Sequence, residues 1–212
     1  MLEIEKIVSA TMDVNTYIVW QEGDSRAIVI DPSFEVDRVL YCLQNESLQC
    51  EAILLTHGHF DHIAGVKKLK EETGAKVYIH TKDAPMLTEA EKNLSAGFGI
   101  DITAVAADEL LEQAIVTIAG MEVKVLHTPG HSEGSVCYFI EEALFSGDTL
   151  FNLSIGRTDF PGSDWGQMKK TLEKIKLIEG DYMVYSGHGN STSLAYEVDN
   201  NPYLGEKKWS LC

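Results

Sequence analysis

The chain has 212 residues, 44% of them hydrophobic, which is enough for one domain with a sizeable buried core. Its 33 acidic and 17 basic residues give a formal charge of −16, which would repel the phosphates of nucleic acids and the anionic headgroups of membranes. No run approaches the roughly 20 apolar residues of a membrane span and no signal peptide begins the chain, so we expect a cytoplasmic protein without nucleic-acid or membrane partners.

The apolar runs predict an antiparallel start, then alternating strands and helices, then a strand-rich second half. Short runs bounded by turn residues predict strands, at 2–8, 16–20, 26–30, 52–55, 76–80, two between 115 and 126, 135–140, 143–145 and 182–185. Apolar residues at helical spacing predict helices, at about 34–45, from His62 to Gly74, 82–94 and about 164–178. No repeat or low-complexity linker interrupts this order, so we expect an α/β fold in one domain over 1–212, with two packed sheets and helices outside.

A dense group of metal-ligand residues follows the predicted strand at 52–55. Residues His57, His59, Asp61 and His62 place three imidazoles and a carboxylate within six positions. Such donors suit Zn²⁺, Fe or Mn. Because the spacing turns the side chains alternately, we expect two adjacent ions rather than one.

Three later loops repeat this arrangement, each with a candidate ligand directly after a glycine and near the end of an apolar strand. The pairs are Gly130-His131, Gly147-Asp148 and Gly187-His188. A glycine lets the backbone turn sharply and approach a site that a Cβ would obstruct. Each pair alone is a weak signal, but their order after the first group strongly favours a metal site.

In this order the motifs His-x-His-x-Asp-His, Pro-Gly-His, Gly-Asp-Thr and Gly-His-Gly resemble those of the metallo-β-lactamase superfamily, over most of the chain. The resemblance implies a four-layer αβ/βα sandwich with the metals at one edge. It also implies the ligands: His57, His59 and His131 for one ion, Asp61, His62 and His188 for the other, and Asp148 between them. The implied cofactors are two divalent ions, Zn²⁺ first, with Fe or Mn as alternatives.

The sequence motifs at 56–65, 127–134, 154–162 and 201–204 are similar to those of glyoxalase II, and most similar to those of its short bacterial form. Longer glyoxalases II continue into a helical domain that supplies much of the glutathione-binding surface. Only 24 residues follow His188, so we expect that domain to be absent. The resemblance implies a small thioester substrate, with glutathione thioesters among the candidates.

The predicted chemistry is hydrolysis of a thioester or ester. Two ions bridged by Asp148 would lower the pKa of a water held between them from about 15.7 toward about 7, so that a bridging hydroxide exists at neutral pH. Asp61 and Asp148 are the predicted catalytic carboxylates. We expect direct attack on the acyl carbonyl, without a covalent enzyme intermediate.

Two other activities share these ligands. A sulfur (persulfide) dioxygenase of the same superfamily uses a single iron and also has a Gly-Arg-Thr-Asp-Phe motif. In this chain the motif lies at residues 156–160. Pro161-Gly162 follows, which is closer to the short hydrolases, so we favour hydrolysis. A lactonase is the second alternative.

Several roles stay open at this level. Arg157 is the predicted substrate-binding residue, meeting an anionic group, and its alternative is an ion pair with Asp159 or another nearby carboxylate. Asp31 either orients a ligand imidazole or caps the next helix. His80 and His127 are predicted to be core or supporting residues rather than ligands. The four cysteines have no Cys-x-x-Cys spacing, and we expect free thiols.

Overall fold

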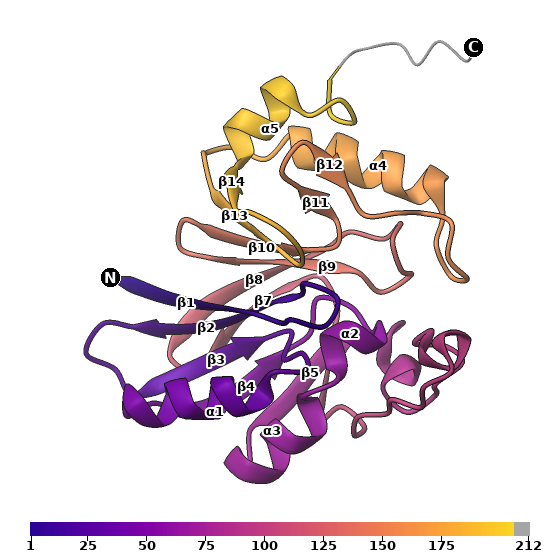
Figure 1. The fold of residues 1–212 in the computed structure, drawn as a ribbon. Helices are drawn as coiled ribbons and strands as arrows, with labels where there is room; N and C mark the ends of the chain where they lie inside the picture. Colours follow the sequence, from indigo (N-terminus) through magenta and orange to yellow (C-terminus); the bar gives the residue numbers. More distant parts are fainter. Residues whose placement is uncertain (206–212) are drawn as a thin grey trace.

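The computed structural model describes residues 1–205, and within them two six-stranded sheets face each other (Figure 1). The first sheet has its strands in chain order, antiparallel from β1 to β3 and parallel from β3 to β6. Its strands are β1 (Leu2–Val8), β2 (Asn15–Gln21), β3 (Arg26–Ile30), β4 (Gln49–Leu54), β5 (Lys76–His80) and β6 (Glu109–Leu111). The parallel strands β3, β4 and β5 therefore direct their carboxyl ends to the same edge.

The second sheet has the order β14-β13-β10-β9-β8-β7. It is antiparallel except for the parallel pair of β10 and β13. Its strands are β7 (Ala114–Ile118), β8 (Met121–His127), β9 (Val136–Ile140), β10 (Ala143–Gly147), β13 (Met183–Ser186) and β14 (Thr192–Ser193). A short hairpin, β11 (Leu150–Phe151) with β12 (Ser154–Ile155), forms a separate two-stranded sheet.

Helices cover the outer faces of both sheets, which confirms the predicted four layers (Figure 1). Helices α1 (Val36–Asn45) and α3 (Val66–Thr73) lie on the first sheet, and the short α2 (Phe60–Ile63) comes between them in the chain. Helices α4 (Trp165–Lys176) and α5 (Leu194–Asn200) lie on the second. Each longer helix buries one apolar stripe, such as Met168, Leu172 and Ile175 of α4.

The apolar core has three layers that match this architecture. One cluster lies between the first sheet and α1 and α3, one between the two sheets, and one between the second sheet and α4 and α5. Strand β2 is buried over its first five residues because both of its faces are covered. Across residues 1–205, no helix is long and apolar enough to cross a membrane.

The predicted helix at 82–94 is wrong. One 3₁₀ helix, Ala84–Leu87, lies in this range and a second, Ser95–Phe98, follows it, with turns between the two. The buried Asn93 side chain donates to the carbonyls of Met86 (3.0 Å) and Ile102 (2.7 Å), which fixes a folded loop in place of a helix.

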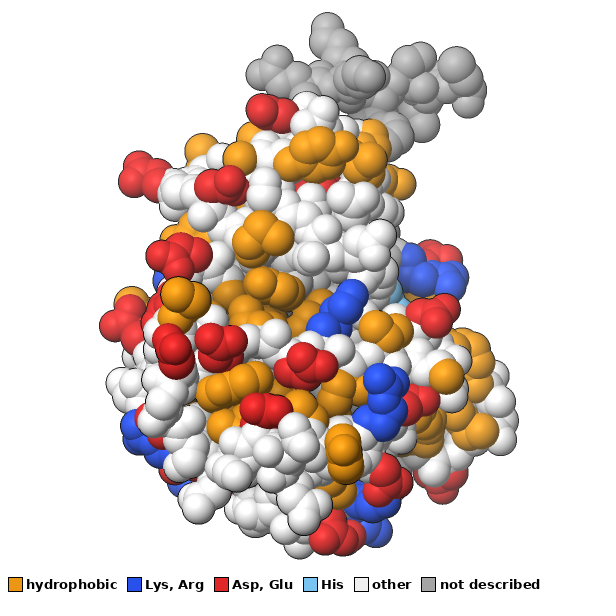
Figure 2. All heavy atoms as spheres, turned by 60° about the vertical axis from the view of Figure 1, so that its left-hand side comes forward, with side chains coloured by type: hydrophobic (Ala, Val, Ile, Leu, Met, Phe, Trp, Pro, Cys, Tyr) orange, Lys and Arg blue, Asp and Glu red, His pale blue; other side chains and the backbone are white. Residues whose placement is uncertain are grey.

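Other short elements were not predicted at all. They are β6, the β11–β12 hairpin, β14 and α5. Of the cysteines, Cys42, Cys50 and Cys137 are free thiols, as predicted, and Cys212 lies outside the described residues. On the face drawn in Figure 2, basic side chains are scattered among acidic and apolar ones and form no continuous stripe.

Candidate metal centre

The loops that carry the predicted ligands meet at one edge of the sandwich. The loop after β4 and helix α2 come from the first sheet, and the loops after β8, β10 and β13 come from the second. All seven predicted ligands are brought together by these loops.

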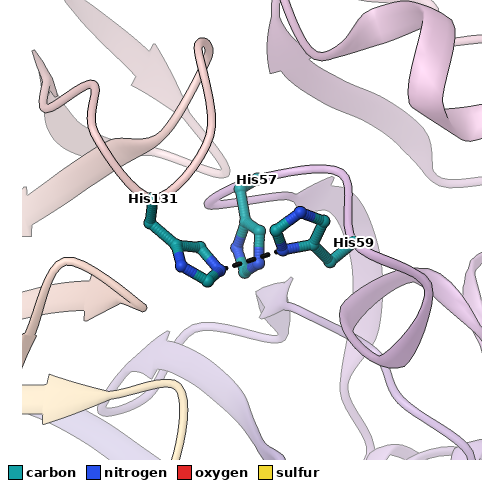
Figure 3. Close-up of side chains that lie close together, drawn as sticks. All are labelled: His57, His59 and His131. Atoms are coloured by element: carbon teal, nitrogen blue, oxygen red, sulfur yellow. Dashed lines mark hydrogen bonds between the residues drawn. The ribbon is translucent and has the colours of Figure 1, made fainter. Parts of the chain in front are cut away.

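One group joins His57, His59 and His131, all buried, with ligand atoms within 4.8 Å of one another. Figure 3 shows their rings converging from two separate loops, with the dashed line joining His59 and His131. The His59 Nδ1 and His131 Nε2 atoms are 2.9 Å apart. Three imidazoles at this spacing form a set suited to one divalent ion.

A second group joins Asp61, His62 and His188, again with ligand atoms within 4.8 Å of one another. The Asp61 Oδ2 atom lies 3.5 Å from His188 Nε2 and 3.8 Å from His62 Nε2. Two imidazoles and a carboxylate form a second set for a divalent ion.

Asp148 lies between the two groups. Its Oδ1 atom is 3.4 Å from His62 Nε2, and its Oδ2 atom is 3.5 Å from His131 Nε2 and 3.6 Å from His188 Nε2. A carboxylate in this place can contact ions held by either group, as the bridging role requires.

A second observation also indicates that these side chains bind cations. Among the described residues, the buried atoms His57 Nε2, His59 Nε2 and Asp148 Oδ1 have no hydrogen-bond partner. A buried polar atom without a partner is costly, and nearly all such atoms in native proteins are satisfied. A divalent ion in the first group would satisfy His57 Nε2, and an ion beside Asp148 would satisfy its Oδ1, whereas His59 faces the first group through its Nδ1 atom.

Electrostatics also favours cation binding. Burial, and next the neighbouring imidazoles, hold the pKa of His57 and His59 well below the ordinary value, so both rings are neutral and free to ligate. Burial works against protonation of His62, but Asp61, Asp148 and Asp31 outweigh it and raise its pKa to about 10. Without metal, a proton on His62 therefore supplies the positive charge that the carboxylates attract.

Asp31 orients His62 and does not cap a helix. Its Oδ2 atom is 3.0 Å from His62 Nδ1, and Thr56 donates to the same carboxylate from its backbone N (2.8 Å) and its hydroxyl (2.6 Å). Helix α1 begins after Glu35, without a side-chain cap. Asp31 also lies within 4.8 Å of the ligand atoms of His57 and His62, but its oxygens are already engaged.

Asp83, which no sequence motif marked as part of the site, joins two ligand loops. Its buried carboxylate accepts hydrogen bonds from Gly58 N (3.1 Å), Ser132 Oγ (2.6 Å) and Gly134 N (2.7 Å). Burial raises the pKa of this carboxyl, and the three hydrogen bonds oppose the rise. Asp83 thereby holds the loops of His57 and His131 together, so that both histidines lie in the same ligand group.

Residues 130–134 also fit the Gly-x-Ser-x-Gly pattern of some serine hydrolases. Ser132 is buried, however, and its hydroxyl donates to Asp83 and lies 2.7 Å from Ser135 Oγ. Its structural role is to connect these side chains.

Two of the glycines before ligands are required by close contacts. A Cβ on Gly187 would lie 2.3 Å from Asp148 Oδ1, and a Cβ on Gly147 would lie 2.3 Å from Thr56 Oγ1. Gly147 also has a φ of +49°, a left-handed conformation that favours glycine. The predicted reason for these glycines is confirmed at both positions.

His80 and His127 lie outside the ligand groups found among the described residues, as predicted. Their rings stack on each other at 4.1 Å, and His127 Nε2 lies 2.9 Å from the Glu133 carbonyl oxygen. Burial and the neighbouring His127 lower the pKa of His80 to about 4.

Residues near the C-terminus support the edge of the site. The buried Asn201 side chain donates to the carbonyls of Phe151 (3.4 Å) and Ser154 (3.0 Å), and to Glu197 Oε2 (2.7 Å). Glu197 in turn accepts from Leu153 N at 2.9 Å. Helix α5 thus fixes the β11–β12 hairpin, whose Phe151 ring lies 6.1 Å from the His188 ring.

A cavity of about 500 Å³ opens over the metal centre, and Arg157 lines it. The Arg157 carbonyl oxygen is 2.8 Å from His131 Nδ1, and its guanidinium group pairs with Asp159. The ion pair that the sequence left open is therefore present. The predicted contact between Arg157 and substrate stays a prediction.

The fold and the clustered donors define a metallo-hydrolase, and the chain belongs to the metallo-β-lactamase superfamily, whose family model matches residues 11–188. It is 30% identical to the hydroxyacylglutathione hydrolase GloC of Haemophilus influenzae, over 97% of this chain and 100% of that protein.

Two solved structures are similar over nearly their whole length. The BLEG-1 B3 metallo-beta-lactamase superposes with a TM-score of 0.91 at 38% identity, covering 95% of this chain and 99% of that one. TTHA1623 in a di-iron-bound form has a TM-score of 0.83 at 34% identity, covering 94% and 100%. The protein is a metal-dependent hydrolase of this superfamily, and its ligand cluster suits divalent metals.

Proposed function

We propose that the protein hydrolyses a small thioester in the manner of glyoxalase II, with two divalent ions. The observation that carries the proposal is the position of Asp148 between two separate ligand groups. The similarity of this chain to GloC, over 97% of its length, supports a thioester as the substrate.

In this proposal one ion is held by His57, His59 and His131, the other by Asp61, His62 and His188, with Asp148 contacting both. When bound, such ions would lower the pKa of a coordinated water toward about 7 and would polarise an acyl carbonyl. Zn²⁺ is our first choice of metal, and the di-iron form of TTHA1623 makes Fe the first alternative.

The protein's part is to fix which ring nitrogens face the centre. Asp31 accepts the hydrogen of His62 Nδ1, so His62 Nε2 is left to ligate. The Arg157 carbonyl oxygen does the same for His131, accepting from Nδ1 and leaving Nε2 free. Such supporting contacts orient ligand rings and raise their basicity.

The cavity suits a leaving group that needs no proton. Apart from the proposed ligands, Arg157 is the one ionisable residue among the described residues that line the cavity, and its guanidinium group cannot act as an acid at neutral pH. An amine or alkoxide leaving group requires protonation, whereas a thiolate leaves as the anion. This difference favours a thioester over an amide.

A substrate panel tests the proposal. The metal-loaded protein would be assayed on thioesters, lactones and β-lactams, and on a glutathione persulfide with an oxygen electrode. We expect the highest kcat/KM on a thioester. Oxygen consumption with the persulfide by a one-iron protein would establish a dioxygenase, and higher kcat/KM on lactones would establish a lactonase. Either result would contradict the proposal.

A further inference from the structure

The walls of the active-site cavity are largely apolar. Its apolar lining residues include Met12, Phe60, Leu94, Phe98, Phe151 and Phe160. Two of these side chains are well exposed in the free protein, Met12 at 45% and Phe98 at 57%. Apolar side chains gathered around a polar floor and left exposed are typical of a ligand-binding cavity.

The one arginine of this cavity is paired with an acidic residue, so the pair has no net charge. Apart from the histidines of the metal centre, Arg157 is the one basic side chain among the described residues of the lining. Its Nε and Nη2 atoms each donate to Asp159 at 2.7 Å, a two-point pairing, and its guanidinium group lies 4.0 Å from the centre of the Phe160 ring. The opposite charges of Arg157 and Asp159 therefore cancel beside the cavity.

An anionic substrate gains little from displacing this pair. Arg157 and Asp159 are 60% and 67% exposed, so their bond is weak and can exchange. If a substrate carboxylate took the place of Asp159, however, the Asp159 carboxylate would remain beside it without a partner. The formal charge of −16 on the whole chain adds to the repulsion.

We propose that the enzyme selects neutral, apolar thioesters over anionic ones, and that Asp159 sets this selectivity by cancelling the charge of Arg157. This inference rests on the proposed thioester hydrolysis and narrows it. Arg157 would then meet the substrate through the flat face of its guanidinium group, beside Phe160. Glutathione thioesters, whose peptide carries carboxylates, would be poor substrates.

The test compares two thioesters with the same acyl group, one of N-acetylcysteamine and one of glutathione. For the wild type we expect kcat/KM to be about 10-fold or more higher on the neutral thioester. In Asp159→Asn, which frees the charge of Arg157, we expect KM for the glutathione thioester to fall about 5-fold or more with little change on the neutral one. Asp37→Asn is the matched control, because it breaks an exposed pair with Lys68 outside the cavity and should leave both values unchanged.

A binding measurement separates this inference from the proposed function. S-hexyl-glutathione and S-hexyl-N-acetylcysteamine are thioethers that cannot be hydrolysed, and their Kd values can be measured by calorimetry. We expect the neutral compound to bind more tightly to the wild type and the preference to shrink in Asp159→Asn. If no thioester is hydrolysed, the proposed function fails while this binding result still decides the inference. Tighter binding of the glutathione compound to the wild type, or an unchanged preference in Asp159→Asn, would overturn it.

Discussion

The Asp31 carboxylate lies 3.0 Å from Nδ1 of His62 and also accepts two hydrogen bonds from Thr56. Strand β3 ends at Ile30, directly before Asp31, and β4 ends two residues before Thr56, so neighbouring parallel strands place these groups together. One buried carboxylate thus fixes both the start of the ligand loop and the orientation of a ligand ring.

We expect Asp31→Ala to lower the affinity of the second ligand group for metal by roughly 10- to 100-fold, because His62 loses the acceptor that orients its ring. Competition titration with a chelating dye measures this affinity. Asp37→Ala, at an exposed position on α1, serves as the control and should bind metal as the wild type does. Equal affinity in Asp31→Ala and wild type would show that His62 is oriented by other contacts.

Asp83→Asn should reduce the free energy of unfolding by about 1–3 kcal/mol. Both oxygens of Asp83 accept from backbone N–H groups, those of Gly58 and Gly134, so an amide NH₂ in either orientation meets a donor. Urea unfolding measures the loss. The exposed Asp101→Asn should change stability by less than about 0.5 kcal/mol, and a similar small change in Asp83→Asn would contradict the role given to this carboxylate.

Titration of His80 makes the free energy of unfolding depend on pH. Its pKa is about 4 in the folded protein, below the ordinary 6.5. As pH falls below 6.5 the unfolded chain takes up a proton at His80 and the folded protein does not, so the free energy of unfolding decreases from pH 6.5 to 4. Above pH 6.5 this group contributes no slope.

We expect His80→Gln to flatten the pH dependence of the free energy of unfolding by up to about 1.4 kcal/mol per pH unit within this window. Chemical unfolding at several pH values, with metal chelated in both proteins, measures the difference between variant and wild type. Parallel curves for the two proteins between pH 4 and 6.5 would mean that His80 titrates normally in the folded state.

The sequence was most informative where the chemistry is local. His57, His59, Asp61 and His62 lie within six residues, so their spacing alone indicated a metal site. Asp148 and His188 could be placed through the family resemblance, since each alone is only a residue after a glycine. The two-sheet architecture followed from short, continuous apolar runs such as those at 26–30 and 52–55.

The sequence was least informative where a side chain acts across the fold. Asp83 bonds to Gly58, 25 residues away, and to Gly134, 51 residues away, and no local pattern marks such a partner. The same is true of Asn93, whose bonds to Met86 and Ile102 replace the helix that the apolar spacing predicted. Tertiary hydrogen bonds outweighed helix propensity in that segment.

Asp148→Ala should abolish most of the activity, because this change removes the carboxylate that lies between the two ligand groups. His80→Ala, outside both groups, should change kcat only modestly. Steady-state kinetics on the preferred thioester compares the two variants. Similar losses in both would contradict the role of Asp148.

Metal stoichiometry tests the two-ion centre most directly. The wild type and Asp148→Ala would be purified, loaded with Zn²⁺ or Fe²⁺, freed of excess metal, and analysed by inductively coupled plasma mass spectrometry. We expect about two ions per chain in the wild type, since each ligand group supplies the three protein ligands that a catalytic ion usually needs, and clearly fewer in the variant. One ion per chain in a fully active wild type, with no loss in Asp148→Ala, would contradict the account.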